Sequence, residues 1–420
     1  TDCKKDENFA KNVFSWLAVV LLGITIIFEI FMPFVVWVLA PGFSSDPGKM
    51  QLTVVIARIM FFYVIFVCIA AFLSAVLNAM SKFLLAAFMP VMLNLMLISG
   101  LLISSFFAQG TVLYIMSITV ILSGIIQCAI LWGRIRRHHF GLRLIIPKWT
   151  PQIKSMLKRF GVSIIGSGFY QISIIVGTLV ASFQPGAVSW LYYSDRIIQL
   201  PFAMIGLAVG TVLMSSISNA LAEKNMRSVY IQQNSSMRRS MMLIMPCVFG
   251  LLVLAEPIIK YLFQYGAWTA ESTHAVAVAI MIQVFALPAM LVSQIYSKTL
   301  YASQDVKTPV KTSMVSLGVA AVLYFALFPV IGYLSIPVGI VVSGYIKNYL
   351  LGRACRIKGL CRLDGRTVRA ITFFAVLAGG CGFALSYIKV TSIFVLAFAI
   401  FGYALVYLPI AYIVDRKIIK

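Results

Sequence analysis

Acidic residues and histidines are scarce in this sequence, whose 420 residues include only 12 Asp and Glu and 3 His. A membrane enzyme that works on a lipid phosphate needs clustered carboxylates for a metal ion, or a positioned acid and base. A chain with so few groups of these types, most of them in predicted loops, cannot easily build either arrangement. The composition therefore argues against an enzyme and predicts no metal site and no cofactor.

Nucleotide-binding and hydrolase motifs are also missing. The sequence contains no Walker A motif, no glycine-rich phosphate loop, no HExxH and no GxSxG. Cys355 and Cys361 lack CxxC spacing and have no histidine nearby, so they do not indicate a zinc site. These absences give no support to ATP-driven transport within this chain and leave a secondary carrier or flippase.

Long apolar runs dominate what is present. The chain is 61% hydrophobic and 11% charged, with a mean hydropathy of +0.98, which is more apolar surface than a soluble core can hide. About twelve runs approach or exceed the ~20 residues that a helix needs to cross the hydrocarbon layer. They are residues 12–40, 52–78, 83–106, 111–132, 159–183, 187–218, 240–263, 274–300, 312–333, 334–352, 370–388 and 391–413. We therefore predict an all-α fold, a polytopic bundle of about twelve transmembrane helices.

The positive charge, formally +22, follows the predicted loops in a regular pattern. Lys and Arg precede the first predicted helix and follow every even-numbered one, whereas the loops after odd-numbered helices carry only Lys49 and Lys389. By the positive-inside rule, both termini and all even-numbered loops are predicted to be cytoplasmic. The charge is thus mainly a topology signal, with contact to anionic lipids as a secondary use. It does not indicate nucleic-acid binding.

The predicted helix 187–218 carries a polar stripe at membrane depth. At about 3.6 residues per turn, one face holds Ser189, Tyr192 or Tyr193, Arg196 and Gln199. The planar donor fork of an arginine suits a pyrophosphate, so we predict that Arg196 recognises an anion in a central cavity. The alternative is that Arg196 ties its helix to backbone carbonyls of a neighbour. Asp195 points to a different side and needs a partner of its own.

Two other charged residues within predicted helices, Arg58 and Glu29, have alternative interpretations. Arg58, in 52–78, either extends toward the outer interface or lines the same cavity as Arg196. Glu29, in 12–40, is compatible with proton coupling, with pairing to Arg58 or with a satisfied helix contact. The sequence does not choose among these alternatives.

Prolines within the predicted helices are candidate kinks at which a bundle can bend during alternating access. They include Pro33, Pro201, Pro246 and Pro288. The pattern alone does not choose among them, and Pro288 lies within the predicted span 274–300.

Several short stretches along the chain form a sequence pattern that can be compared with known families. They are Ala40-Pro41-Gly42-Phe43, Leu77-Asn78 through Phe88-Met89-Pro90 to Leu93-Asn94, Ser189 to Arg196, Gly206 to Gly210-Thr211, Phe263-Gln264-Tyr265-Gly266 with Thr269-Ala270, and Gln304 to Lys311. Together these stretches are specific, although each alone would be weak. The chain resembles the MurJ (MviN) lipid II flippases of the multidrug/oligosaccharidyl-lipid/polysaccharide exporter superfamily.

The resemblance implies fourteen helices, in two six-helix lobes around a cationic cavity, with two last helices forming a groove for a lipid tail. By this resemblance we expect the chain to lack the family's first two helices. Residues 1–132 would then form a partial first lobe, 159–352 the second lobe and 370–420 the groove. Residues 133–158 and 353–369 would be basic cytoplasmic linkers.

Site residues also follow from the resemblance. Arg196 matches the family's cavity arginine, with Ser189 earlier on the same face, whereas Gln199 stands where related sequences often have Glu. A sodium site known in some relatives is not expected, because residues 312–352 contain neither Asp nor Glu. The candidate substrate-binding residues are Arg196, Ser189, Arg58, Gln199 and Tyr193.

The predicted function is to flip lipid II, an undecaprenyl-pyrophosphate-linked peptidoglycan precursor, from the cytoplasmic to the periplasmic leaflet of a bacterial inner membrane by alternating access. The alternatives are a flippase for another polyprenyl-linked glycan, an ion-coupled drug exporter of the same superfamily and a structural scaffold. The scarcity of intramembrane carboxylates favours an anionic cargo over cationic drugs. The expected partners are the glycan-carrying lipid, membrane lipids and other peptidoglycan-synthesis proteins, with no nucleic acid.

Overall fold

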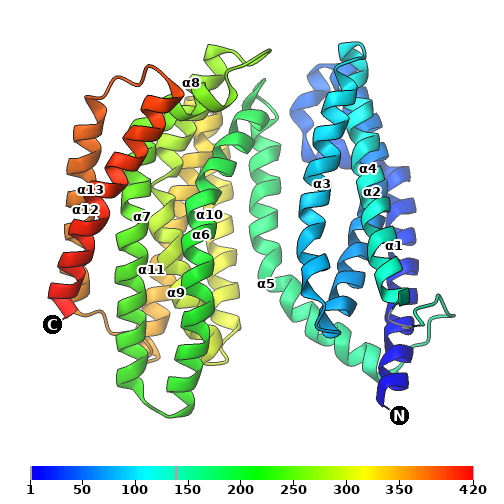
Figure 1. Ribbon diagram of the computed structural model, residues 1–420, viewed down its shortest axis with the longest axis horizontal. Coiled ribbons are helices and arrows are strands. Elements are labelled where there is room, and N and C mark those ends of the chain that lie inside the picture. Colours follow the sequence, from blue (N-terminus) through cyan, green and yellow to red (C-terminus); the bar gives the residue numbers. More distant parts are fainter. Residues whose placement is uncertain (1, 138–140, 420) are drawn as a thin grey trace. The chain divides into compact units, whose positions relative to one another are not determined.

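A computed structural model describes residues 2–137 and 141–419, and over these residues the chain is helical without β-strands (Figure 1). The chain divides into two compact units, Thr1–Ser163 and Ile164–Lys420, each of which is described by itself. Within the described residues, eight helices are long and apolar enough to span a membrane, or nine if one bent helix pair counts as a span. The predicted class, an all-α polytopic membrane protein, is confirmed.

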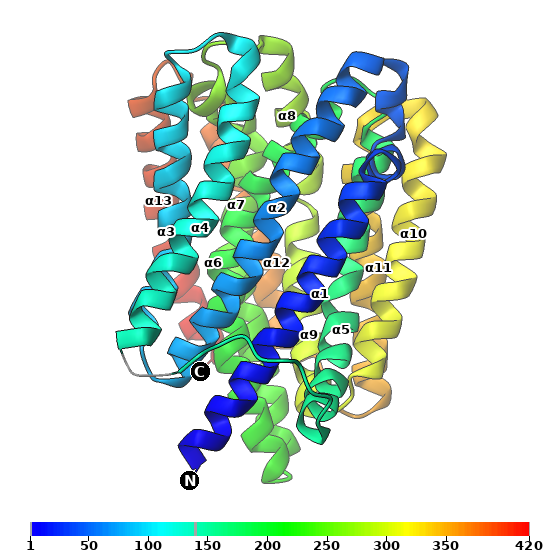
Figure 2. The ribbon, with the colours of Figure 1, turned by 90° about the vertical axis from the view of Figure 1, so that its right-hand side faces the viewer.

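The first unit is an antiparallel helical bundle. Its described residues form α1 (Asp2–Leu39), α2 (Pro47–Ala79), α3 (Phe83–Ser104), α4 (Val112–Arg137) and the start of α5 (Pro151–Ala181), with 3₁₀ turns at Pro41–Ser45 and Gln109–Thr111. Helix α2 packs against α1 and α4, and α3 packs against α4 (Figure 2). Phe14, Leu73, Leu77 and Leu131 are buried where α1, α2 and α4 meet, because the apolar stripes of these helices face one another there.

The second unit is organised around one long helix, α7. Its described helices after α5 are α6 (Ala187–Ala222), α7 (Met226–Phe263), α8 (Ala270–Gln283), α9 (Ala286–Ala302), α10 (Lys307–Ile331), α11 (Ser335–Ile357), α12 (Gly365–Ser386) and α13 (Ile393–Ile419), with a 3₁₀ turn at Gly332–Leu334. Helix α7 packs against α6, α8, α9, α12 and α13, and Figure 1 shows α12 and α13 lying together along it. Ile244, Ile280 and Phe374, from α7, α8 and α12, are fully buried in the largest core cluster.

The predicted span 274–300 corresponds to two helices, α8 and α9, which are bent by 43° close to the candidate kink Pro288. Pro288 lies in the first turn of α9, and its missing N–H cannot bond the carbonyl of Val284 in a helical ladder. The other candidate kinks, Pro33, Pro201 and Pro246, lie inside the unbroken helices α1, α6 and α7. Helix α6 packs against both α8 and α9 and so crosses the break.

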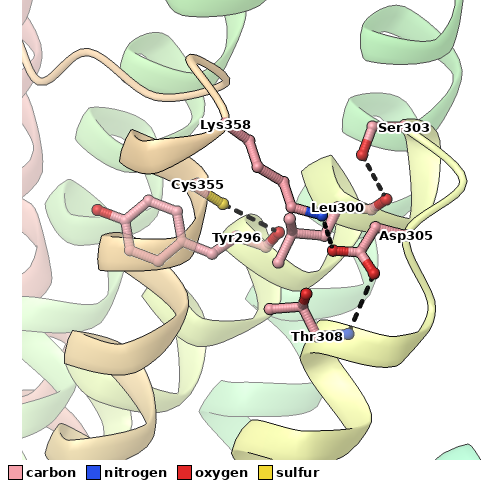
Figure 3. Close-up of polar contacts among 7 residues, drawn as sticks. All are labelled: Tyr296, Leu300, Ser303, Asp305, Thr308, Cys355 and Lys358. Carbon is pink, nitrogen blue, oxygen red and sulfur yellow. Dashed lines mark hydrogen bonds and ion pairs between the residues drawn. The ribbon is translucent and has the colours of Figure 1, made fainter.

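A polar junction joins the ends of α9, α10 and α11 (Figure 3). Gln304 has a φ of +63°, and the next N–H, that of Asp305, bonds the carbonyl of Leu300 at 2.9 Å, which ends α9. The Asp305 carboxylate accepts hydrogen bonds from the Lys358 ammonium and from the backbone N–H of Thr308, the latter at 3.1 Å. Burial pushes the pKa of Asp305 up, but these hydrogen bonds outweigh that effect and hold it at about 2.

A second polar junction ties α7 to α12 and α13. The Arg238 guanidinium on α7 pairs with Asp415 on α13 at 3.2 Å and donates to the Thr367 hydroxyl on α12 at 3.5 Å. Asp415 and Thr367 are buried, with 6% and 0% of their surfaces exposed. This arginine therefore cross-links three helices at one level of the second unit.

Candidate functional site

The start of α6 is held in place by Trp190. The preceding Gly186 has a φ of +81°, and a Cβ added there would come within 2.7 Å of the Trp190 ring, so glycine fits both the turn and the packing. The indole N–H of Trp190 donates to the Ser272 hydroxyl on α8 at 3.2 Å. Its ring meets that of Tyr333 edge to face, with 5.2 Å between centroids. The rotation of α6 is thus constrained at its first turn.

On another side of α6, Ser189, Tyr192 and Arg196 lie on an exposed face. The guanidinium carbon of Arg196 lies 4.9 Å from the centroid of the Tyr192 ring, a cation–π contact one helical turn apart. Within the described part of the chain, Arg196 forms no ion pair and donates no hydrogen bond to a protein group. Its donor fork is therefore not used up by neighbouring carbonyl oxygens, contrary to the alternative considered from the sequence.

Tyr193 lies away from this face. Its ring packs against Phe263 and Trp268, with centroid separations of 4.9 and 4.8 Å, at the edge of the main core cluster. Of the two tyrosines that the sequence left open for the stripe, the structure therefore places Tyr192 beside Arg196.

The interior side of α6 carries a hydrogen-bonded cluster around Asp195. One carboxylate oxygen accepts from the Gln199 amide, and the other accepts from the Gln283 amide nitrogen at 3.3 Å. The amide oxygen of Gln283 in turn accepts from the Ser194 hydroxyl at 3.3 Å. Gln199 is half-buried and bonded to Asp195, so it is not an open member of the exposed stripe. The sequence analysis missed Gln283, whose signal was a polar residue inside an otherwise apolar run.

Arg58 and Glu29 belong to the first unit, where they lie on adjacent helices. Arg58 is exposed on α2, and its charge acts on the half-buried Glu29 of α1, but the two form no ion pair among the residues that the structure describes. One oxygen of Glu29 and the hydroxyl of Thr25, one turn earlier, are buried without a hydrogen-bond partner. Of the alternatives left open for Glu29, the pairing with Arg58 is therefore not found among the described residues.

The chemistry available on α6 is anion binding. An exposed guanidinium can hold phosphate oxygens, with the Ser189 hydroxyl two helical turns away on the same face, and the Tyr192 ring restricts the positions of the guanidinium. Over residues 2–137 and 141–419, no group of three or more His, Cys, Asp or Glu gathers in a metal-binding arrangement. A multi-pass helical bundle with an available arginine on one of its helices is compatible with a membrane carrier.

A family model described as lipid II flippase MurJ matches residues 1–408, and the chain belongs to that family. It is 35% identical over 348 residues to a probable lipid II flippase MurJ of Rhizobium meliloti (strain 1021), covering 82% of this chain and 65% of that protein. It is 29% identical over 350 residues to the lipid II flippase MurJ of Burkholderia cenocepacia, covering 82% of this chain and 67% of that protein. The chain thus spans about two thirds of the length of these curated relatives.

Solved structures show the same fold. A lipid II flippase MurJ in an inward closed conformation superposes with a TM-score of 0.82 at 20% identity, covering 99% of this chain and 86% of that one. An inward-facing MATE family multidrug resistance transporter of the MOP superfamily matches with a TM-score of 0.69 at 13% identity, covering 85% of this chain and 82% of that one. At these identities the likeness concerns the fold alone.

Proposed function

We propose that this chain moves lipid II between the leaflets of a bacterial inner membrane, and that Arg196 binds the pyrophosphate of this cargo during the passage. Membership of the MurJ family supports the cargo. The observation that carries the role of Arg196 is its availability: the side chain is exposed and donates to no described protein group. Transport by this route makes and breaks no bond.

An arginine at membrane depth costs ~2.5–3.5 kcal/mol on insertion scales, and such residues usually face a partner or a cavity. Since the described partner of Arg196 is only the ring of Tyr192, an anionic cargo would supply the missing acceptors. Ser189 lies on the same exposed face and adds a hydroxyl donor. A pyrophosphate offers oxygens on two phosphorus atoms, which suits a planar fork better than an ammonium.

The orientation and the wider assembly are part of the same proposal. The alternation of basic loops supports a cytoplasmic location for both termini of this chain, and the proposed direction of movement is from the cytoplasmic to the periplasmic leaflet. Residues 1–132 and 159–352 act as the two moving lobes, while α12 and α13 guide the prenyl tail. The anionic headgroup makes the movement sensitive to membrane potential, and other peptidoglycan-synthesis proteins are the expected partners.

The test is exchange of a fluorescent lipid II between leaflets of proteoliposomes that contain the chain. R196A should lower the exchange rate by at least about tenfold, because the headgroup loses its charge-assisted hydrogen bonds. Arg136 on α4 provides a matched control, since it is also exposed and also stacks on an aromatic residue one turn earlier, Trp132, at 5.6 Å. R136A should exchange lipid at the parental rate, and equal rates for R196A and the parent would refute the proposed site.

A further inference from the structure

We propose that Gln283 is a positioning residue for Arg196. Its amide clamps two successive residues of α6, Ser194 and Asp195, and thereby holds α6 at the rotation that presents the guanidinium on the exposed face. The importance of this rotation for transport rests on the proposed function, whereas the clamp is a contact between α6 and α8 in its own right.

The clamp uses both ends of one side-chain amide. The Gln283 nitrogen donates to Asp195 at 3.3 Å, and its oxygen accepts from the Ser194 hydroxyl at 3.3 Å, a proton that Ser194 shares with the Leu191 carbonyl at 2.9 Å. Ser194 is fully buried and Gln283 is 5% exposed, so water cannot easily replace either bond. The bond to Asp195 and the shared bond to Ser194 both favour the rotation of α6 that keeps these two residues against Gln283.

Helix α6 is held on α8 at a second level as well. Trp190, one turn before the clamp, donates to Ser272 at the other end of α8. Gln283 is the last residue of α8, directly before the 43° bend between α8 and α9. The position of its amide relative to α6 therefore depends on where this bend lies. Together the two attachments determine the direction in which each residue of this α6 segment points.

The consequence for Arg196 follows from helix geometry. Successive residues on an α-helix point about 100° apart, so holding Asp195 against α8 turns Arg196 away from it. The clamp also keeps the carboxylate occupied by amide donors, and in the described chain Asp195 forms no ion pair with Arg196 or any other cation. The guanidinium therefore stays available to a ligand.

The electrostatic surroundings of Asp195 make this clamp testable by pH. Three helices pack on α6, and their charged side chains include Glu256 and Lys260 on α7, Glu271 and His274 on α8, and Lys298 on α9. Within the described residues none of these bonds Asp195, and Arg196 is the neighbouring charge that acts on it. A titratable group introduced at position 283 would consequently report on Asp195 itself.

The experiment is the lipid exchange assay performed with Q283E from about pH 6 to pH 9. While the introduced carboxyl group is protonated it copies the amide, because its O–H donates to Asp195 and its carbonyl oxygen accepts from Ser194. When both carboxyls ionise, like charges face each other and the clamp opens, so exchange by Q283E should fall at least fivefold as pH rises. The parent should show no such fall.

Two further variants separate the clamp from a general effect of a new carboxyl group. In D195N/Q283E the amide and the carboxylate exchange places, so the contact between the two positions needs no shared proton, and the fall with pH should disappear. Gln232 on α7 is the matched control, because it is half-buried and, among the described residues, its amide bonds Ser228 alone, one turn earlier, at 3.3 Å. Q232E should show the pH profile of the parent.

A second readout follows the rotation of α6 without any cargo. The rate at which a maleimide labels Y192C, measured against the parent as blank, reports the environment of the exposed face, since the described cysteines of the chain are buried or half-buried. Because only the thiolate reacts, each rate is divided by the rate of Y192C alone at the same pH. Adding Q283E should change this ratio at least threefold over the pH range, and adding D195N/Q283E should not. If the labelling responds but the parent exchanges no lipid II, the proposed function fails and the clamp stands. If neither exchange nor labelling responds to pH in Q283E, the clamp is refuted.

Discussion

The guanidinium of Arg196 lies over the ring of Tyr192, with 4.9 Å between the guanidinium carbon and the ring centroid. Both side chains are exposed, and they are separated by one turn of α6. A ring in this position restricts the long arginine side chain without consuming its N–H donors, because the attraction acts on the flat face of the guanidinium. The contact therefore positions the Arg196 guanidinium for an anionic ligand while its N–H donors remain available.

Removing the Tyr192 ring tests whether it positions the Arg196 guanidinium. Cation–π contacts at exposed sites contribute about 0.5–1 kcal/mol, so Y192L should raise the lipid II concentration at half-maximal exchange by about two- to fivefold. The maximal rate should change less, because the guanidinium remains. Y192F keeps the ring and should retain most of the affinity, and a loss in Y192F equal to that in Y192L would contradict a role for the ring.

The shape of the cation can be tested apart from its charge. R196K keeps a positive charge but replaces the planar fork by a compact ammonium. We expect exchange to fall about tenfold below the parent and to stay above that of R196A, because monodentate contact to the pyrophosphate survives. Equal rates for R196K and the parent would show that only the charge matters.

The Lys358–Asp305 pair should make stability depend on pH at acidic values. The folded-state pKa of Asp305 is held at about 2, below its ordinary value of 3.8. The stabilisation is therefore fully present above 3.8 and is lost as pH falls toward 2. Lys358 is half-exposed, so solvent weakens the pair, and K358M should cost on the order of 1 kcal/mol at neutral pH.

Thermal unfolding of K358M in detergent checks this expectation. The melting temperature should be lower than that of the parent at neutral pH, and the difference should shrink as the pH is lowered through the range of the Asp305 titration. K389M is the control, since Lys389 is exposed and forms no ion pair in the described chain. A difference that persists unchanged at acidic pH would assign the effect of K358M to something other than this pair.

The buried pair of Arg238 and Asp415 should be more costly to break. R238M leaves the Asp415 carboxylate buried without its cation, and breaking such pairs typically costs ~3–5 kcal/mol. Limited proteolysis should therefore cut near α13 faster in R238M than in R239M, whose parent residue is exposed and unpaired in the described chain. The double variant R238M/D415L should regain much of the resistance, because it removes both charges.

Replacing Glu29, unlike replacing Lys358 or Arg238, should raise the stability of the fold. One of its oxygens is buried without a hydrogen-bond partner, an arrangement that costs about 1–3 kcal/mol. E29M should accordingly raise the thermal midpoint of the chain in detergent, whereas E271M, at an exposed position in the first turn of α8, should not. A lower midpoint for E29M would mean that the carboxylate has a stabilising partner.

Much of the fold was predictable from local pattern. Apolar runs such as 83–106 and 370–388 correspond closely to α3 and α12, because an isolated stretch of this length and composition can satisfy its backbone in lipid only as a helix. The bend between α8 and α9 lies beside Pro288, one of the candidate kinks, but the sequence did not choose this proline over the others. Pro33, Pro201 and Pro246 carry the same local signal without interrupting their helices, so the packing of α6, α7 and α11 around the break must decide the outcome.

For the site, the sequence by itself determined that an arginine stands within an apolar helix, with polar residues at helical spacing around it, since periodicity is a local property. Only the tertiary structure decided that Tyr192 rather than Tyr193 accompanies Arg196, and that Gln283 holds Asp195. Adjacent residues differ by about 100° in direction, and the choice between them depends on which neighbouring helix supplies aromatic rings or an amide. Those partners lie 70 to 90 residues away in the chain, beyond the reach of any local pattern.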